Sequence, residues 1–169
     1  FVGFKKNNNF YVREFKLSEA KSAYKTLRKK IVNLGICKIL HLYGGMLVPP
    51  SFICMRPLKQ LFYKNTKNDG MFACEMIDPT TYTTHTRYIP DNTFMGCKRS
   101  NPAMLEYCQY LEQLISNDFT AESEFKQSTT KFLLKMVKEN KIKTIDGQKI
   151  GIKDENNNIV GMHDLFNTK

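Results

Sequence analysis

Two pairs of breaking residues stand close together in the middle of the chain and limit its fold. Gly44 and Gly45 end one apolar segment, and Pro49 and Pro50 interrupt the next. Glycine gives the backbone more conformational freedom than other residues do, and proline lacks the backbone N–H that the interior of a strand or helix needs. The apolar run Met46–Val48 between the two pairs is therefore predicted to form a buried strand that the prolines interrupt.

The segment before the glycine pair has the pattern of a helix followed by a second apolar element. Ser18 is a favourable N-cap, and apolar residues recur at helical spacing as far as Leu34. Gly35 is predicted to end this helix, because glycine commonly follows the last residue of a helix. The next run, Ile36–Tyr43, fits either a helix or a strand, and the glycine pair closes it.

The rest of the chain alternates between strand-like and helical segments. A strand is predicted over Met71–Glu75, and a helix begins at Pro102, because proline favours the first helical position. A further helix over residues 121–140 and a hairpin that turns at Asp146 and Gly147 complete the pattern. The alternation favours an α/β fold with an open mixed sheet flanked by helices. The residues of the helix from Pro102 that are predicted to face the sheet are Leu105, Cys108 and Leu111.

These elements predict three parts of the chain. Residues 1–17 form an N-terminal arm, residues 18–141 form an α/β core, and residues 142–169 form a C-terminal hairpin and tail. The chain begins at Phe1 and ends at Lys169 without the features of natural termini. It is therefore interpreted as a piece of a longer protein that continues beyond residue 169.

Positive charge is concentrated in the first quarter of the chain. The net charge is +10, and residues 1–38 carry ten Lys or Arg residues against two Glu residues. Several of these cations share a broad helical face, which favours an anionic partner. The residues predicted to bind this partner are Lys21, Lys25, Arg28 and Lys29. An acidic protein, nucleic acid, anionic lipid and a merely solvated face all remain open.

The aromatic content of this basic helix bears on the choice of partner. Tyr24 is the one aromatic residue that stands among the four cations. Proteins that bind single-stranded nucleic acid usually stack bases on several aromatic side chains. We therefore predict a protein contact for this face, with weak, sequence-independent nucleic-acid binding beside it.

The cysteine pattern argues against a disulfide framework. The five cysteines are odd in number and widely spaced, and no Cys-x-x-Cys pair occurs. A thiolate zinc site is disfavoured for the same reason. Reduced, buried thiols in a reducing compartment are predicted. No apolar run approaches the ~20 residues that span a bilayer, so no membrane segment is predicted here.

The titratable residues show no specific catalytic or metal-binding pattern. The histidines, dispersed along the chain, are His41, His85 and His163. His41 is interpreted as a core histidine, and His163 beside Asp164 as a loop residue rather than a base with its orienting acid. The acidic residues of the middle segment are Asp69, Glu75, Asp78 and Asp91. A pair of them could hold Mg²⁺ or Mn²⁺, but none has Asp-x-Asp spacing, so no catalytic residue and no metal ligand is predicted.

One stretch resembles a known family. Residues 40–51 read Leu-His-Leu-Tyr-Gly-Gly-Met-Leu-Val-Pro-Pro-Ser, and Arg56-Pro57-Leu58 follows. This resembles the sugar-binding region of DXD-type glycosyltransferases, especially the family-32 group, in which a helix ending in Leu-x-x-Tyr-Gly-Gly enters a strand that finishes in Asp-x-Asp. Residues 89–96 and Asn101-Pro102 are similar to the family's later Asn-containing strand and the helix after it.

The resemblance covers about residues 18–116 and implies an incomplete fold similar to glycosyltransferase A. It also implies the position of a sugar-donor site. The residues at the donor-site positions are Tyr43, Gly44, Gly45, Pro49, Pro50, Ser51 and Asn92.

The chain departs from the family at the residues that matter for catalysis. The Asp-x-Asp of the family falls on Pro49-Pro50-Ser51, and an upstream Asp and Arg that meet the nucleotide fall near Asn33 and Ile36. Asp-x-Asp bridges a divalent cation to the diphosphate of the donor, and two prolines and a serine supply no carboxylate for that role. The resemblance therefore implies a degenerate domain without a cofactor.

The expected function is a structural or interaction module with protein partners in a larger assembly. The chain is also similar to uncharacterised proteins of large DNA viruses, which its Lys- and Asn-rich composition fits. A minor capsid protein or another virion component, located in the cytoplasm or the virion, is the concrete form of this expectation. Two alternatives stay open. One is an active glycosyltransferase that uses Mn²⁺ or Mg²⁺ with a nucleotide sugar, or needs no metal. The other is a nucleic-acid or phosphate-binding module.

Overall fold

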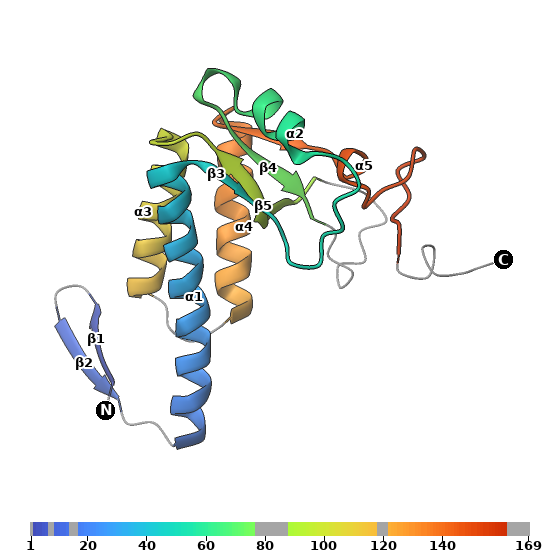
Figure 1. The fold of residues 1–169 in the computed structure, drawn as a ribbon. Helices are drawn as coiled ribbons and strands as arrows, with labels where there is room; N and C mark the ends of the chain where they lie inside the picture. Colours follow the sequence, from blue (N-terminus) through green and yellow to red (C-terminus); the bar gives the residue numbers. More distant parts are fainter. Residues whose placement is uncertain (1, 7–8, 14–16, 77–87, 118–121, 162–169) are drawn as a thin grey trace.

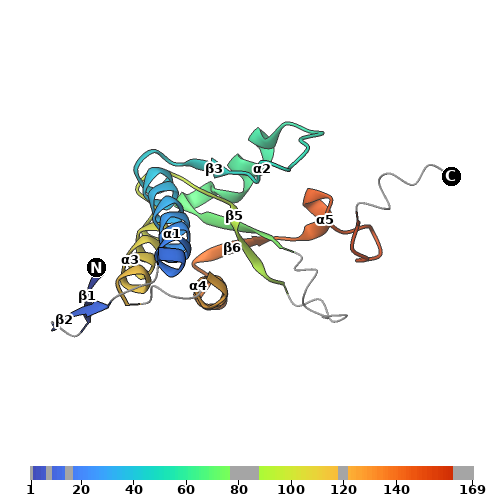
Figure 2. The same cartoon turned by 90° about the horizontal axis from the view of Figure 1, so that it is seen from below.

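The computed structural model describes residues 2–6, 9–13, 17–76, 88–117 and 122–161. Side chains are described from residue 24 onward within these ranges, except at positions 69, 122 and 123. Three helices cover one face of a central sheet, and shorter elements cover the other (Figure 1). Seen from below, the three helices lie on one side of the strands (Figure 2).

The central sheet has four strands in the order β3-β5-β4-β6. The strands are β3 (Gly45–Leu47), β4 (Met71–Glu75), β5 (Pro90–Cys97) and β6 (Ile142–Ile145). β5 runs antiparallel to both of its neighbours, and β4 pairs in parallel with β6. The prediction of a mixed α/β fold with an open mixed sheet is thus confirmed.

Helix α1 (Leu17–Tyr43) is continuous, so the predicted end at Gly35 is wrong. Cys37 and Leu40, which follow Gly35, are buried in the core. Their packing offsets the cost of about 1 kcal/mol that an interior glycine adds. The helix also begins at Leu17, which places Ser18 in its first turn rather than at the N-cap. Beyond the ends of α3 and α4, the first turns of α1 extend alone (Figure 1).

The glycine pair ends α1, as predicted, because both residues adopt a backbone that favours glycine. Gly44 has φ of 71° and Gly45 has φ of 119°. The N–H of Gly44 donates to the carbonyl of Leu40 at 2.8 Å. A Cβ on Gly44 would lie 2.6 Å from the backbone nitrogen of Arg99, so a side chain at this position would not fit.

Helices α3 (Pro102–Asn117) and α4 (Glu122–Lys138) pack beside α1 on the same face of the sheet. The side-chain oxygen of Asn101 accepts from the N–H of Met104 at 2.9 Å and caps α3. α3 begins at Pro102, as predicted. α3 and α4 meet through Tyr110 and Phe132, whose rings stack with centroids 3.9 Å apart.

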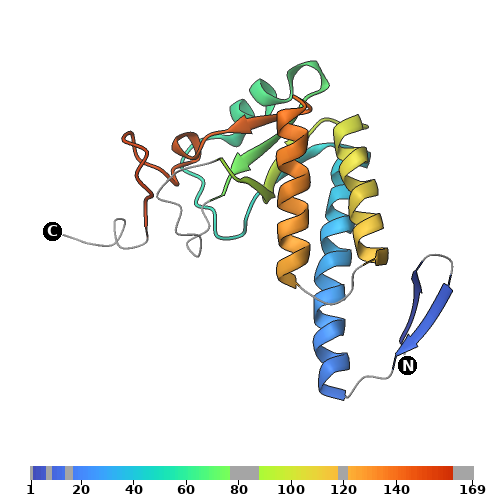
Figure 3. The same cartoon turned by 180° about the vertical axis from the view of Figure 1, so that it is seen from behind.

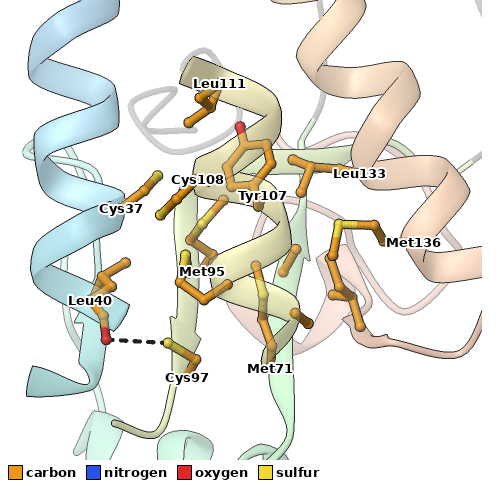
Figure 4. Packing of buried hydrophobic residues seen from close by; sticks show 14 of the residues in the cluster. Cys37, Leu40, Met71, Met95, Cys97, Tyr107, Cys108, Leu111, Leu133 and Met136 are labelled. Carbon is orange, nitrogen blue, oxygen red and sulfur yellow. Dashed lines mark hydrogen bonds between the residues drawn. The ribbon is translucent and has the colours of Figure 1, made fainter. Parts of the chain in front are cut away.

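The predicted inward face of α3 is partly wrong. Cys108 and Leu111 are buried, but Leu105 is 42% exposed, and Tyr107 is fully buried instead. Met104, Tyr107, Cys108 and Leu111 recur at helical spacing, so a face that includes Tyr107 has to leave Leu105 outside. The larger core cluster lies between this face, α1, α4 and the sheet (Figure 4).

The opposite face of the sheet is covered by short elements. α2 (Leu58–Asn65), a short helix after Pro57, packs Leu61 and Phe62 against the cluster formed by Phe72, Cys74, Phe94 and Ile145. The segment after β3 adds Val48 and Phe52 to the same cluster. A 3₁₀ turn, η1 (Lys67–Asp69), leads from α2 into β4.

The hairpin predicted around Asp146 and Gly147 is wrong. β6 is an edge strand of the sheet, and the short helix α5 (Gly147–Ile150) follows it directly. The side chain of Asp146 accepts from the N–H of Gln148 and caps α5. β6 pairs with β4, far away in sequence, so residues 142–145 belong to the central sheet rather than to a hairpin.

A buried ion pair fixes the segment after α5 to the sheet. Lys153 Nζ lies 2.5 Å from Glu75 Oε1, and the two side chains are 5% and 4% exposed. The other carboxylate oxygen of Glu75 accepts from the N–H of Gly147 at 2.8 Å. The C-terminal end of β4 is thus joined by charge and hydrogen bonds to both ends of α5.

Strands β1 (Val2–Lys6) and β2 (Asn9–Arg13) form a separate antiparallel pair in the region predicted as an arm. Seen from behind, the pair lies apart from the central sheet, beside the lower end of α3 (Figure 3).

Leu111 and Leu105 provide a direct test of the face that α3 buries. Replacing the fully buried Leu111 by Ala should cost about 2–5 kcal/mol of unfolding free energy. The Leu105→Ala variant should cost less than about 0.5 kcal/mol, because its side chain is partly in water. Urea denaturation followed by circular dichroism measures both. Equal costs would contradict the packing of α3.

The ion pair is tested by removing one partner and then both. The Lys153→Met variant should lose about 3–5 kcal/mol, because it leaves the Glu75 carboxylate buried without its cation. The double variant Glu75→Leu/Lys153→Met should be more stable than this single variant in the same urea titration. A Lys153→Met variant within about 1 kcal/mol of the parent protein would contradict a buried pair.

Candidate binding cleft

A cleft of about 840 Å³ opens between α1, the segment after β3, β5 and the start of α4. α1 supplies its longest wall, from Lys25 to Ile36. β5 contributes Asn92 and Thr93, and α4 contributes Phe125 and Lys126. The cleft therefore joins segments that are far apart in sequence.

Apolar residues from three segments line the cleft and are here together called its floor. α1 contributes Val32 and Ile36, and the end of β3 contributes Leu47. The chain after β3 adds Val48, Pro49 and Pro50. Because the prolines stop β3, its pairing with β5 ends at Leu47 and Met95. Beyond this pair, residues 48–50 of one segment and Asn92 and Thr93 of the other line the cleft.

The walls of the cleft are cationic. The cations that line it are Lys25, Arg28, Lys29, Lys30 and Lys126. No Asp or Glu occurs among the described residues that line it. Clustered charges of one sign in a concave surface raise the local concentration of ligands of the opposite sign. The cleft therefore attracts anionic groups.

Lys30 and Phe125 form the junction between α1 and α4. Lys30 is 2% exposed, and its Nζ lies 5.0 Å from the ring centroid of Phe125. Such cation–π contacts are attractive. Phe125 itself is 7% exposed, so its ring offers little free surface to a ligand.

An irregularity of β5 directs Asn92 and Thr93 to the cleft. β4 advances from Ala73 to Glu75 while β5 passes from Met95 to Pro90, so residues 91–94 bulge from the ladder. Asp91 stabilises the bulge, because one of its carboxylate oxygens accepts from both the N–H and the hydroxyl of Thr93 at 2.7 Å. The Asp91 carboxylate is thus engaged locally.

The Tyr107 hydroxyl lies near Asn92 of this bulge. It is fully buried, and no described residue lies within hydrogen-bonding geometry of it. Burial raises the pKa of Tyr107 well above its ordinary value, the nearby Cys37 thiol acts in the same direction, and the side chain of Asn92 partly opposes both. Asn92 thus interacts with the buried phenol and also lines the cleft.

The predicted donor-site positions are divided by the structure. Pro49, Pro50 and Asn92 line the cleft, together with Asn33 and Ile36. The remaining positions, outside the cleft lining, are Tyr43, Gly44, Gly45 and Ser51. Of these, Tyr43 is 78% exposed at the end of α1, and the glycines serve the turn into β3.

The predicted basic face coincides with one wall of the cleft. Lys25, Arg28 and Lys29 all line it, whereas the side chain of Lys21 lies outside the described residues. Sequence reasoning missed Lys30 and Lys126 as parts of the same surface. Lys126 is on α4, so no spacing along the basic helix could have indicated it.

The other titratable candidates do not gather at the cleft. His41, half-buried, has its Nδ1 3.1 Å from the carbonyl of Asn101 and so joins α1 to α3. Glu75 is bound to Lys153 on the far side of β4. The candidates outside the described residues are Asp78, His85, His163 and Asp164, together with the side chain of Asp69. Within the described ranges, no group of three or more His, Cys, Asp or Glu could hold a metal ion.

Comparison with known proteins gives no match to a protein-family model, to a curated protein or to a solved structure. In the part of the chain that the structure describes, no helix is long and apolar enough to cross a membrane.

All five cysteines are free thiols, and Cys54 alone is exposed. Burial raises the pKa of Cys37, Cys74 and Cys97 to about 12. Burial also raises the pKa of Cys108, to about 11. The prediction of buried thiols is therefore right for four of the five and wrong for Cys54, which lies in the loop before α2.

This difference predicts the reactivity of the thiols towards Ellman's reagent. At pH 8 a thiol with a pKa near 12 is ionised in about one molecule in ten thousand, and burial blocks the reagent as well. The native protein should release about one equivalent quickly, from Cys54, and all five after denaturation in guanidinium. A Cys54→Ser control should abolish the fast phase. Rapid release of more than one equivalent from the native protein would contradict the packing.

Proposed function

We propose that the chain is a catalytically degenerate glycosyltransferase-like domain that serves as an interaction module for an acidic protein partner. One observation carries the proposal: Pro49 and Pro50, which stand where the resemblance places metal-binding carboxylates, line a cleft whose charged residues are cations. A minor capsid protein or another virion component is the setting that we propose for this module.

The charge of the cleft supports this choice over a metal-dependent transferase. A nucleotide sugar bound through Mn²⁺ needs carboxylates, which hold the cation against the diphosphate. The described residues of the cleft offer amides, two threonine hydroxyls and backbone carbonyls, and the five cations repel a divalent ion. An acidic protein surface meets the four exposed cations of the cleft, Lys25, Arg28, Lys29 and Lys126, favourably.

The scarcity of accessible aromatic rings supports a protein over single-stranded nucleic acid. Phe125 is the one aromatic residue among the described residues that line the cleft, and it is 7% exposed. Tyr24 is 65% exposed but lies outside the cleft lining. The cleft therefore offers cations to the phosphates of a nucleic acid but little aromatic surface on which its bases could stack.

Isothermal titration with Mn²⁺ and UDP- or GDP-sugars tests the loss of donor binding. We expect no binding tighter than about 1 mM, because no carboxylate joins the metal to the cleft. Micromolar binding of any donor would overturn the proposal in favour of an active enzyme.

The partner class is tested by fluorescence anisotropy at physiological salt with polyglutamate and with single-stranded DNA. Polyglutamate should bind, and the Lys25→Glu/Arg28→Glu/Lys29→Glu variant should abolish this binding. The matched control reverses three exposed lysines outside the cleft, Lys59, Lys64 and Lys149, with the same change of net charge. Tighter binding of DNA than of polyglutamate, lost in the first variant alone, would show that the partner is a nucleic acid.

A further inference from the structure

The shape of the cleft restricts the kind of partner that can bind, in addition to the restriction that the charge of the cleft imposes. A cleft of about 840 Å³ is concave and lies within the range of about 300–1,000 Å³ that is usual for ligand sites. A flat protein surface or a bilayer fills such a concavity poorly. A protruding side chain or a short segment of chain can.

The apolar residues of the floor favour a ligand that carries an apolar group. Val32 is 53% exposed and lines the cleft together with Pro49 and Pro50. Exposed apolar surface in a concavity is favourable to cover, and buried apolar anchors dominate the affinity of many interfaces. The ligand therefore carries a bulky apolar side chain.

The exposed cations that line the cleft, here called its rim, favour a ligand with carboxylates on either side of its apolar side chain. Lys25, Arg28 and Lys29 are exposed on α1, and Lys126 is exposed at the start of α4. Arginine binds carboxylates through two parallel hydrogen bonds, and lysine binds them as a point charge. Cations from two helices thus border the apolar floor.

The backbone around the floor offers little for strand pairing. Pro49 and Pro50 have no N–H, and the N–H of Thr93 is already bonded to Asp91. A peptide therefore gains more from its side chains than from addition to the edge of β5. A second copy of this chain is disfavoured as the occupant, because each copy carries a net charge of +10.

We infer that the cleft binds a short acidic peptide segment that inserts one bulky apolar side chain between α1 and the Pro49-Pro50 segment. This inference rests on the proposed function and specifies its partner. The segment places its anchor on Val32 and the prolines, and its flanking Asp or Glu residues against the cations of α1 and α4.

Three labelled peptides separate the parts of the inference in an anisotropy titration at physiological salt. The first is Glu-Glu-Leu-Phe-Glu-Asp-Glu, the second has Gly-Ser in place of Leu-Phe, and the third has Gln and Asn in place of the acids. The first should bind at least about tenfold more tightly than either of the others, because they lack the anchor or the charge.

A pair of neighbouring substitutions tests the site on the protein. The Val32→Glu variant places a carboxylate in the floor and should weaken binding of the first peptide by about tenfold or more. The Ile31→Glu variant is the matched control, because Ile31 is 52% exposed on the same helix but does not line the cleft. Its affinity should stay within about twofold of the parent protein. Both positions are exposed, and circular dichroism melting verifies that both variants fold.

The outcomes distinguish this inference from the proposed function. Equal binding of the acidic peptides with and without the anchor would overturn the inference and leave an acidic partner in place. Equal binding of the anchored peptides with and without acids would overturn it as well. No binding of any peptide, with binding of single-stranded DNA or of vesicles containing phosphatidylserine, would overturn both.

Discussion

Gly44 lies where the C-terminal end of α1 comes closest to the segment between β5 and α3. The space beside it is so small that a Cβ would lie 2.6 Å from the backbone nitrogen of Arg99. Further bonds hold the two segments together: the N–H of Ser100 donates to the carbonyl of His41, and the thiol of Cys97 donates to the carbonyl of Leu40 (Figure 4). The position of α1 against the sheet, and with it the long wall of the cleft, depends on this contact.

Two irregularities of the sheet, the early end of β3 and the bulge of β5, open the cleft beside α1. Proline stops β3 after three residues, and β5 bulges at the point where β3 no longer accompanies it. A longer β3 paired along β5 would bring these two segments together at the place where the cleft opens. An intact β ladder and an open cleft are therefore alternatives here, and Pro49 and Pro50 favour the cleft.

The sequence predicted well those features that depend on a few neighbouring residues. The turn at Gly44 and Gly45 and the start of α3 at Pro102 follow from backbone preferences that tertiary contacts reinforce. The predicted helix end at Gly35 and the predicted hairpin at Asp146 also rested on local preferences, but distant contacts reversed them. Burial of Cys37 and Leu40 carries α1 through Gly35, and pairing with β4 places β6 in the sheet. For the same reason the basic helix was recognised as a surface, but the contribution of Lys126 from α4 was not.

The ion pair between Glu75 and Lys153 has a consequence for the evolution of the chain. Both side chains are almost fully buried, so a change at one position leaves a charge that the other can no longer neutralise. Selection on folding then acts on the pair rather than on either residue, and the two positions are expected to covary among homologues. Folding constrains exposed cations of the cleft such as Lys25 and Arg28 less strongly than this buried pair, so this surface can follow the changing sequence of a partner while the ion pair stays fixed.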